Sequence, residues 1–334
     1  MKMFRFGATR CALVTLFVSL TPYSFCDAHA QGYPAKVVRL VVPTTAGSGA
    51  DVIGRIVAGG LTQVFKQQVI VDNRGGASSN IGAEIVARAP ADGYTLLQAS
   101  MTLAANVSLF RNLPYDLLRD FAPVTLVAVQ PHIVVVHPSL PVKSVRDLVR
   151  LAKARPGAVS FSSAGAGTTT HLTAELFKHM AGVDLLHVPY NGGGPALTAV
   201  LSGEVMVYFA PLPTSLPLTR SGRLRALAVT TGTPFAGTPE YPTAYPTVAE
   251  AGGLPGYELV TWYGLMAPAK TPQSTIAALQ TATLAVLKRP EVNKRLIDLA
   301  YVPAGTRPEE FSTRIQADIA KIADIVKRSG MSAR

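Results

Sequence analysis

The sequence predicts an α/β protein built from two blocks of alternating strands and helices. Short β-branched runs separated by amphipathic helical stretches are typical of βαβ units around a parallel sheet. Each block contains a strand–loop–helix passage, at 41–51 and at 161–171, whose loop consists of glycine, small residues and hydroxyls. The chain crosses from the first block to the second and returns near its end, so we expect two lobes with a ligand cleft between them.

The first block starts with a βαβαβ pattern. The expected elements are strands at 37–42, 69–71 and 94–98 and helices at 51–65 and 80–89. In the first helix Ile53, Val57 and Leu61 recur at helical spacing, which indicates its buried face. Residues 124–140 are strongly apolar, but Pro131 and Pro138 interrupt them, so they predict sheet strands and not a membrane span.

The second block repeats the alternation. The expected elements are strands at 132–136, 159–161, 186–190, 205–209 and 224–229, a helix ending at 154 and a helix that follows the second glycine-rich loop. Ser144 and Asp147 match a capping box at the start of the first of these helices. Residues 230–256 are rich in Pro, Gly and Thr, which predicts a long surface connection.

The C-terminal part returns to the first block. A strand is expected at 262–267. Two helices finish the chain, one after Pro272 and one after a capping box that runs from Thr306 to Glu309. The last helix carries an apolar stripe through Ile315, which we expect to pack against the first lobe.

The N-terminus fits a secretory signal. Basic residues precede the apolar stretch 11–20, and Ala28 and Ala30 form a small-x-small cleavage site. We therefore expect residues 1–30 to direct export and to be cleaved after Ala30. The alternative is a retained membrane anchor, which would need about 20 apolar residues rather than about ten.

Composition excludes several classes of chemistry. Cys11 and Cys26 both lie in the expected signal, so a mature chain would have no disulfide, thiolate nucleophile or cysteine-bound metal. Loss of three cations and one carboxylate with the signal lowers the formal net charge from +11 to +9. The remaining charges are scattered, which argues against nucleic-acid binding and favours the steering of small anions.

The two glycine-rich loops are candidates for an anion site. Both precede helices and neither carries Lys or Arg, so first-turn N–H groups and the helix dipole would attract the anion. Asp51 can cap its own helix or contact a ligand, and the loop hydroxyls can cap, bind or do both. Two such loops suggest an anion site with two jaws, in which each loop contacts the anion from one side.

Other site chemistry is weakly represented. The sequence has no G-x-S-x-G, Walker or H-E-x-x-H motif, and residues 165–170 match a dinucleotide-binding loop only loosely, so we expect no cofactor. His171 and His179 are too far apart in their helix for a metal pair. His171 can donate to a carboxylate or pack against the neighbouring strand. The enzyme alternative is a hydrolase or transferase that uses Ser162 or Ser163 with His171.

Several sequence blocks follow one another in a fixed order from Tyr33 to the last helix. They are Val42-Pro43 before Gly47 and Asp51, Val71-Asp72-Asn73-Arg74, Asn80-Ile81-Gly82, residues 91–97, His171-Leu172, and residues 188–190, 192–197, 224–229 and 246–252. With these blocks the chain resembles the Bug-type, TctC-like substrate-binding receptors of tripartite tricarboxylate transporters. The resemblance covers essentially the whole mature chain.

The resemblance implies a type II, two-lobed periplasmic binding fold, with lobe I at 31–130 and 255–334 and lobe II at 131–254. It further implies a monomeric periplasmic receptor, not an enzyme, that closes on a small organic carboxylate. Such a receptor passes its ligand unchanged to membrane permease subunits. A sensory receptor that signals to a sensor kinase is the alternative within the binding class.

By the same resemblance, ligand contacts fall on both loops and on two further walls. They are Thr45, Ala46, Gly47, Ser48 and Asp51 in the first loop, Ser162, Ala164, Gly165, Gly167, Thr168 and His171 in the second, and Ser100, Thr102, Tyr190 and Gly193 in the walls. Ala210 stands where many relatives have Asp, a partner for an ammonium group. We therefore hypothesise that the ligand is a carboxylate without an amino group.

Overall fold

The computed structural model describes Met1, Met3 and residues 33–238 and 242–331. The expected cleavage site and, apart from Met1 and Met3, the rest of the export signal lie outside the described residues. The chain divides into Met1–Gly32 and Tyr33–Arg334, and the second unit contains all the described strands and helices. None of these helices combines the length and hydrophobicity needed to cross a bilayer.

The first sheet combines two distant parts of the chain. Its described strands are β1 (Val38–Val42), β2 (Val69–Asn73), β3 (Thr95–Ser100), β4 (Phe121–Gln130), β10 (Thr261–Pro268) and β11 (Val302–Pro303), in the order β11-β4-β10-β3-β1-β2. β1 pairs in parallel with β2 and β3, as predicted, because helical crossovers connect these strands. β10 runs antiparallel between β3 and β4, so the expectation of a parallel sheet is wrong for this half of it.

The second sheet contains only the middle of the chain. Its described strands are β5 (His132–Val136), β6 (Ser160–Ser163), β7 (Leu186–Pro189), β8 (Val207–Pro211) and β9 (Arg225–Val229), in the order β7-β6-β8-β5-β9. β6 pairs in parallel with β7 and β8, whereas β5 is antiparallel to β8 and β9. The lobe boundaries at 130/131 and 254/255 stay a prediction.

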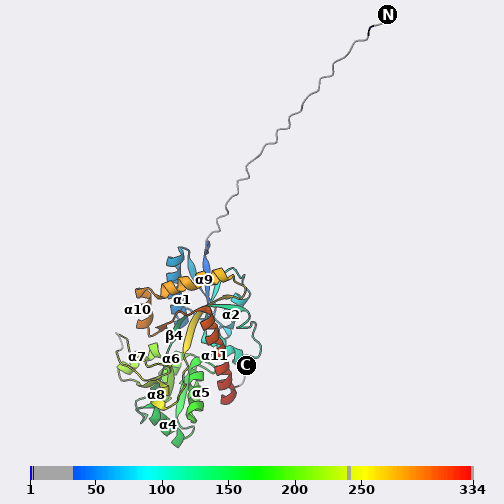
Figure 1. The fold of residues 1–334 in the computed structure, drawn as a ribbon. Helices are drawn as coiled ribbons and strands as arrows, with labels where there is room; N and C mark the ends of the chain where they lie inside the picture. The colour runs from blue at the N-terminus through cyan, green and yellow to red at the C-terminus, as the bar shows by residue number, and fades with distance from the viewer. Residues whose placement is uncertain (2, 4–32, 239–241, 332–334) are drawn as a thin grey trace. The chain divides into compact units, whose positions relative to one another are not determined.

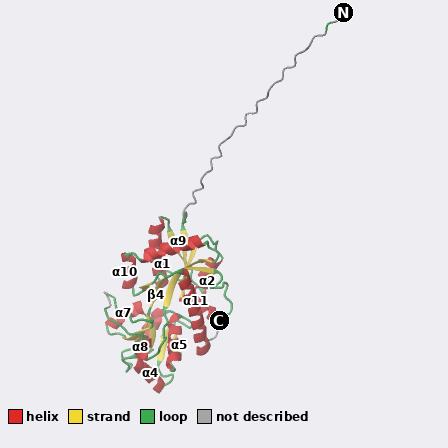
Figure 2. Ribbon diagram, in the orientation of Figure 1, coloured by secondary structure: helices red, strands yellow, loops and turns green. Residues whose placement is uncertain are grey.

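Helices lie outside the strands in both parts of the fold (Figure 2). They are α1 (Gly49–Phe65), α2 (Asn80–Ala87), α3 (Met101–Leu109), α4 (Val145–Ala154), α5 (Thr169–Ala181), α6 (Gly193–Leu201), α7 (Leu212–Arg220), α8 (Val248–Gly252), α9 (Gln273–Leu287), α10 (Pro290–Asp298) and α11 (Pro308–Ser329), with a 3-10 turn at Ala77–Ser79. Ser144 caps α4 as predicted, because its hydroxyl accepts from Asp147 N at 3.1 Å. The expected loop 230–256 also contains α8, whose capping box is formed by Thr247 and Glu250.

The C-terminal helices differ from the prediction in number and in register. The described part of the chain ends with α9, α10 and α11 where two helices were expected, because Pro290 opens a separate short helix. Arg307 is the N-cap residue of α11, and Glu310 accepts from its main-chain N–H at 2.9 Å, one residue later than expected. Thr306 instead binds β4, where its hydroxyl accepts from Leu126 N at 3.1 Å.

Helix α11 packs along both parts of the fold. It contacts α3 and β4, as expected for the first lobe, and it also contacts α5 of the second (Figure 1). Its approach to β10 is close, since a Cβ at Gly264 would lie 2.2 Å from the Phe311 ring. Glycine at this position therefore allows the helix to lie directly on the sheet.

The chain passes from the first sheet to the second and later returns, and these two segments, called the crossovers below, are hydrogen-bonded to each other. β4 ends at Gln130 and β5 begins at His132, so only Pro131 separates these strands. Thr230, which follows β9, donates its N–H to His132 O at 2.9 Å, and Thr230 O accepts from Leu259 N at 3.1 Å. The outgoing and returning chains are therefore tied together between the sheets.

Gly60 and Gly59 in α1 allow a matched test of helix packing. A Cβ at Gly60 would lie 2.3 Å from Val286 Cγ1 in α9, whereas a Cβ at exposed Gly59 would meet nothing within 4 Å. We expect Gly60→Ala to lower the free energy of unfolding by about 1–3 kcal/mol through overpacking. We expect Gly59→Ala to raise it by about 0.5–1 kcal/mol through helix propensity. Urea denaturation measures both changes, and a stabilised Gly60→Ala variant would contradict the packing.

Candidate functional site

A cavity of about 640 Å³ is lined by residues from both parts of the fold. Its lining consists of Ser78, Thr102, Asn106, Leu109, Phe110, Gln130, His132, Ala164, Ala166, Gly167, Thr168, Thr169, Thr170, Pro211, Thr261, Tyr263, Gly330 and Met331. The volume is typical of small-molecule sites. None of these described lining residues is Asp, Glu, Lys or Arg, so the cavity offers hydroxyls, amides and apolar surface without a formally charged side chain.

Residues at the strand crossovers form one side of the cavity. Tyr263 donates its hydroxyl to Gln130 Oε1 at 2.9 Å. Thr261 Oγ1 and His132 Nε2 lie 3.4 Å apart. Burial lowers the pKa of His132 to about 4, so the ring is neutral near pH 7. The crossovers thus contribute neutral polar groups to the site.

The second glycine-rich loop and the start of α5 form another side. α5 begins at Thr169, and Thr168 at its N-cap makes no side-chain capping bond. The hydroxyls fold the loop instead, because Thr168 Oγ1 donates to Gly165 O at 2.7 Å and Thr170 Oγ1 accepts from Ala164 N at 2.9 Å. The first turn of α5 is therefore at the cavity without a side-chain cap, an arrangement that attracts anions through N–H groups and the helix dipole.

Helix α3 brings Asn106 and Leu109 to the same cavity. Asn106 is oriented by its amide, which donates to Ser78 O at 2.7 Å and to Asn80 Oδ1 at 2.7 Å. A Cβ at Gly167 would lie 2.8 Å from Leu109 Cδ1, and Gly167 has a φ of +79°. Both the backbone conformation and the close approach require glycine, so the second loop reaches α3 of the other lobe.

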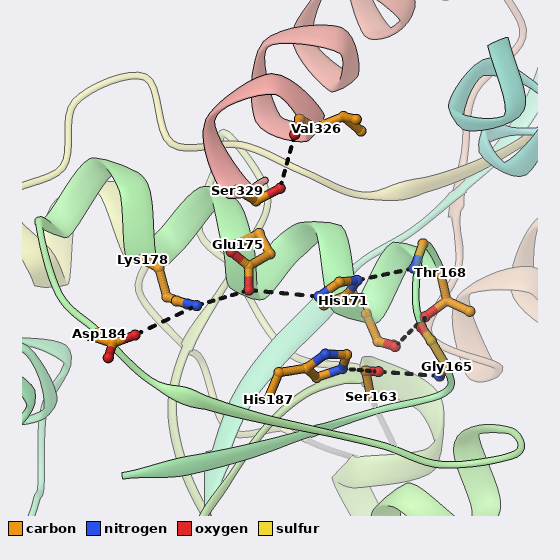
Figure 3. A network of polar contacts seen from close by, with 12 residues as sticks. Ser163, Gly165, Thr168, His171, Glu175, Lys178, Asp184, His187, Val326 and Ser329 are labelled. Carbon is orange, nitrogen blue, oxygen red and sulfur yellow. Dashed lines mark hydrogen bonds and ion pairs between the residues drawn. The ribbon is translucent and has the colours of Figure 1, made fainter. Parts of the chain in front are cut away.

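His171 lies beside the second loop (Figure 3), and it is not among the cavity-lining residues. Its side chain is 4% exposed, and its Nδ1 accepts from Gly167 N at 3.0 Å. Its ring stacks on that of His187, with 3.9 Å between the centroids. Because His187 belongs to β7, packing against the neighbouring strand is the interpretation that fits the structure, and direct ligand contact by His171 stays a prediction.

Ser162 and Ser163 are fully buried. Ser162 Oγ donates to Ala196 O at 3.0 Å, and Ser163 Oγ lies 2.7 Å from His187 Nε2. Both hydroxyls therefore bond to partners other than His171, the base that the hydrolase alternative requires.

The first loop is closed by its own hydrogen bonds. Ser48 caps α1 by accepting from Asp51 N at 3.2 Å. Asp51 in turn accepts from Gly47 N at 2.8 Å, from Arg55 Nε at 2.9 Å and from Asn73 Nδ2 at 2.9 Å. Burial raises the pKa of Asp51, but these hydrogen bonds outweigh it and the net shift is downward. The structure thus fits the interpretation of Asp51 as an ionised cap.

Tyr263 lies between the first loop and the cavity. A Cβ at Gly49, the first residue of α1, would be 3.7 Å from the Tyr263 hydroxyl, and Tyr263 lines the cavity. Residues 44–51 are not among the lining residues themselves. The two loops therefore do not line one surface in this structure, and a site with two jaws stays a prediction.

Of the residues expected to contact ligand, Thr102, Ala164, Gly167 and Thr168 line the cavity. Ser100 lies at the N-cap of α3, Gly193 starts α6, and the Tyr190 hydroxyl donates to Glu204 Oε1 at 2.9 Å. Ligand contact by any of these residues stays a prediction.

Sequence reasoning missed the crossover residues Gln130, His132, Thr261 and Tyr263. They come from strand ends that are far apart in the chain, and no local motif marks them. The one available signal was Pro131 between two apolar strands, which indicates a break where the chain changes sheet.

Comparison with known proteins identifies the family. Residues 53–331 match the family described as the tripartite tricarboxylate transporter family receptor, TctC. The chain belongs to this family. Its members are periplasmic binding proteins, and solved structures with the same fold include BugD, described as a periplasmic binding protein, at 29% identity and a TM-score of 0.73. That similarity covers 90% of this chain and 100% of BugD.

Two further solved relatives contain carboxylates. An R. palustris protein with adipate is 37% identical, with a TM-score of 0.77, and the match covers 90% of this chain and 100% of that one. MatC from Rhodopseudomonas palustris, with bound malate, is 28% identical, with a TM-score of 0.73 over 88% of this chain and 100% of MatC. These relatives confirm the two-lobed periplasmic binding fold, and the chain is a receptor of the TctC and Bug type.

One buried histidine, His132, and one half-buried histidine, His187, predict a pH dependence of stability. Burial lowers the pKa of His132 to about 4, and partial burial lowers that of His187 to about 4. The unfolded chain binds these protons near pH 6.5 and the folded chain does not, so stability falls as pH decreases between these values. We expect a loss of about 2 kcal/mol from pH 7 to pH 5 for His132, and a smaller loss for half-buried His187 because solvent screens it, both measured by urea denaturation.

The matched variants for this measurement are His187→Gln and His179→Gln. His187→Gln removes one of the two titrations and is expected to flatten the pH profile, whereas His179 is exposed and serves as the control. An unchanged slope in His187→Gln, or equal flattening in both variants, would contradict the assignment.

Proposed function

We propose that the protein is exported, with its signal cleaved after Ala30, and captures a small organic carboxylate for delivery to the membrane subunits of a tripartite transporter. The observation that carries this proposal is the first turn of α5, which lies without a side-chain cap at a cavity with no formally charged side chain among its described lining residues. Main-chain N–H groups and the helix dipole stabilise an anion there. The family description supports the transport partner.

We further propose that the ligand has no ammonium group. Ala210 is fully buried, and the adjacent Pro211 lines the cavity. None of the described lining residues offers a carboxylate that would pair with an amino group. Adipate and malate, the carboxylates in the solved relatives, also lack one.

The lobes at 31–130 with 255–334 and at 131–254 are proposed to close about the crossovers. Only Pro131 links β4 to β5, and Thr230 ties the outgoing chain to the returning one. Rotation at such short connections changes few hydrogen bonds within either sheet. Closure would bring the first loop toward the second and complete a site with two jaws.

A ligand panel tests the proposed substrate class. We expect adipate or another dicarboxylate without an amino group to raise the melting temperature, because ligand that binds only the folded state stabilises it. Glutamate and aspartate are expected to bind more weakly in titration calorimetry. Tighter binding of either amino acid than of any non-amino carboxylate would contradict the ligand class, and no shift with any carboxylate would contradict the receptor function.

Thr169 offers a variant that separates binding from folding. Thr169→Asp places a carboxylate in the first turn of α5, where it stabilises the helix by about 0.3–1 kcal/mol but repels an anionic ligand. We expect the Kd of the ligand identified in the panel to rise more than tenfold. Thr169→Asn is the neutral control of similar size and is expected to bind within about threefold of the parent, since it adds no charge. Equal affinities for Asp and Asn would place the anion elsewhere.

A further inference from the structure

Two stacked histidines lie under the second loop and are linked to two of its main-chain N–H groups (Figure 3). Gly167 N–H donates to His171 Nδ1 at 3.0 Å. Gly165 N–H donates to Ser163 Oγ at 3.2 Å, and that hydroxyl shares a 2.7 Å hydrogen bond with His187 Nε2. The loop that lines the cavity is therefore held from below at both of its glycines.

The contact with Gly167 fixes the tautomer of His171. A nitrogen that accepts an N–H carries a lone pair, so the ring proton of neutral His171 must be on Nε2. Nε2 points to Glu175 Oε1, 3.6 Å away. The carboxylate thus favours the tautomer in which Nδ1 can accept from the loop.

Glu175 is held ionised although it is only 7% exposed. Lys178 Nζ lies 3.1 Å from Glu175 Oε1 and 3.8 Å from Asp184 Oδ1. Burial raises the pKa of Glu175, but the hydrogen bonds from His171 and Lys178 outweigh it and the net shift is downward. A chain of contacts therefore runs along α5 from Lys178 through Glu175 and His171 and ends at Gly167.

We propose that His171 is a positioning residue: through Glu175 and Lys178 it presents Nδ1 to Gly167 and thereby fixes the carboxylate-binding loop before ligand arrives. The effect on affinity rests on the proposed function, whereas the effect on the loop does not. With the N–H groups of Gly165 and Gly167 engaged below, the first turn of α5 remains at the cavity for the anion. A loop held in this way loses less conformational entropy on binding.

Two variants of His171 separate the hydrogen bond from the ring. His171→Asn places an amide oxygen near the position of Nδ1 and can still accept from Gly167, but it loses the stacked ring. His171→Phe keeps the stacking on His187 but has no acceptor. If the hydrogen bond positions the loop, His171→Phe raises the Kd about tenfold and His171→Asn stays within about threefold of the parent. The reverse order would overturn the proposal and assign His171 to packing alone.

Two measurements on the ligand-free protein keep the test independent of the proposed function. Imidazole ¹⁵N spectra, assigned with the His171 variants, are expected to show His171 with its proton on Nε2, and a proton on Nδ1 would overturn the proposal. Amide hydrogen exchange at Gly167 is expected to be slow in the parent and in His171→Asn and at least tenfold faster in His171→Phe. Equal exchange in the two variants would also overturn it.

The two proposals fail in different ways. If no carboxylate binds the parent protein but the ¹⁵N and exchange results are as expected, the loop is positioned by His171 and the receptor function is wrong. If carboxylates bind and Thr169→Asp raises the Kd more than tenfold, but both His171 variants exchange alike, the receptor function stands and the positioning role fails.

Discussion

The first turn of α5 is the constraint on which the rest of the site depends. Helix termini leave main-chain N–H groups without partners inside the helix, and the Thr168 side chain makes no capping bond to this one; its hydroxyl donates to Gly165 O. The N–H groups of a partly buried turn of this kind need water or another acceptor. The cavity provides that space, and a carboxylate is the acceptor that best matches the helix dipole.

The crossovers determine what can face this turn. Because β4 passes directly into β5 through Pro131, the strand ends Gln130 and His132 lie at the cavity rather than inside either sheet. Thr230 hydrogen-bonds both to His132 and to Leu259 of the returning chain. These contacts help to place Tyr263 beside Gln130. All of these groups are neutral at pH 7, since burial keeps His132 unprotonated. A cavity built from neutral donors and acceptors suits reversible capture of an anion better than a buried ion pair would, because no unpaired charge remains when the ligand leaves.

Local patterns predicted most of the elements but not their pairing. The helical spacing of Ile53, Val57 and Leu61 predicts a helix from local sequence alone, and α1 forms there. The antiparallel pairing of β10 could not be predicted in this way, because the residues of a strand do not specify which strand will be its neighbour. The same limit applies to the site, where local composition could be read from the sequence and spatial neighbours could not. The glycine and hydroxyl content of the second loop marked it as a ligand loop, yet the neighbour of His171 is His187, on another strand, and no spacing rule relates the two.

The described residues of the proposed anion site include no Lys or Arg, and its specificity would come from main-chain groups. Fixed N–H groups recognise a carboxylate by geometry, so their value depends on how well the loop is held. Here the groups that position the loop are charged, but they are not among the residues that line the cavity. Lys178 and Glu175 act through His171, whose Nδ1 accepts from Gly167 N–H. The charges order the main chain without competing for the ligand or pairing with it. In the proposed receptor, specificity at the carboxylate comes from the backbone, and neutral lining residues such as Asn106 and Gln130 are available for the remainder of the ligand.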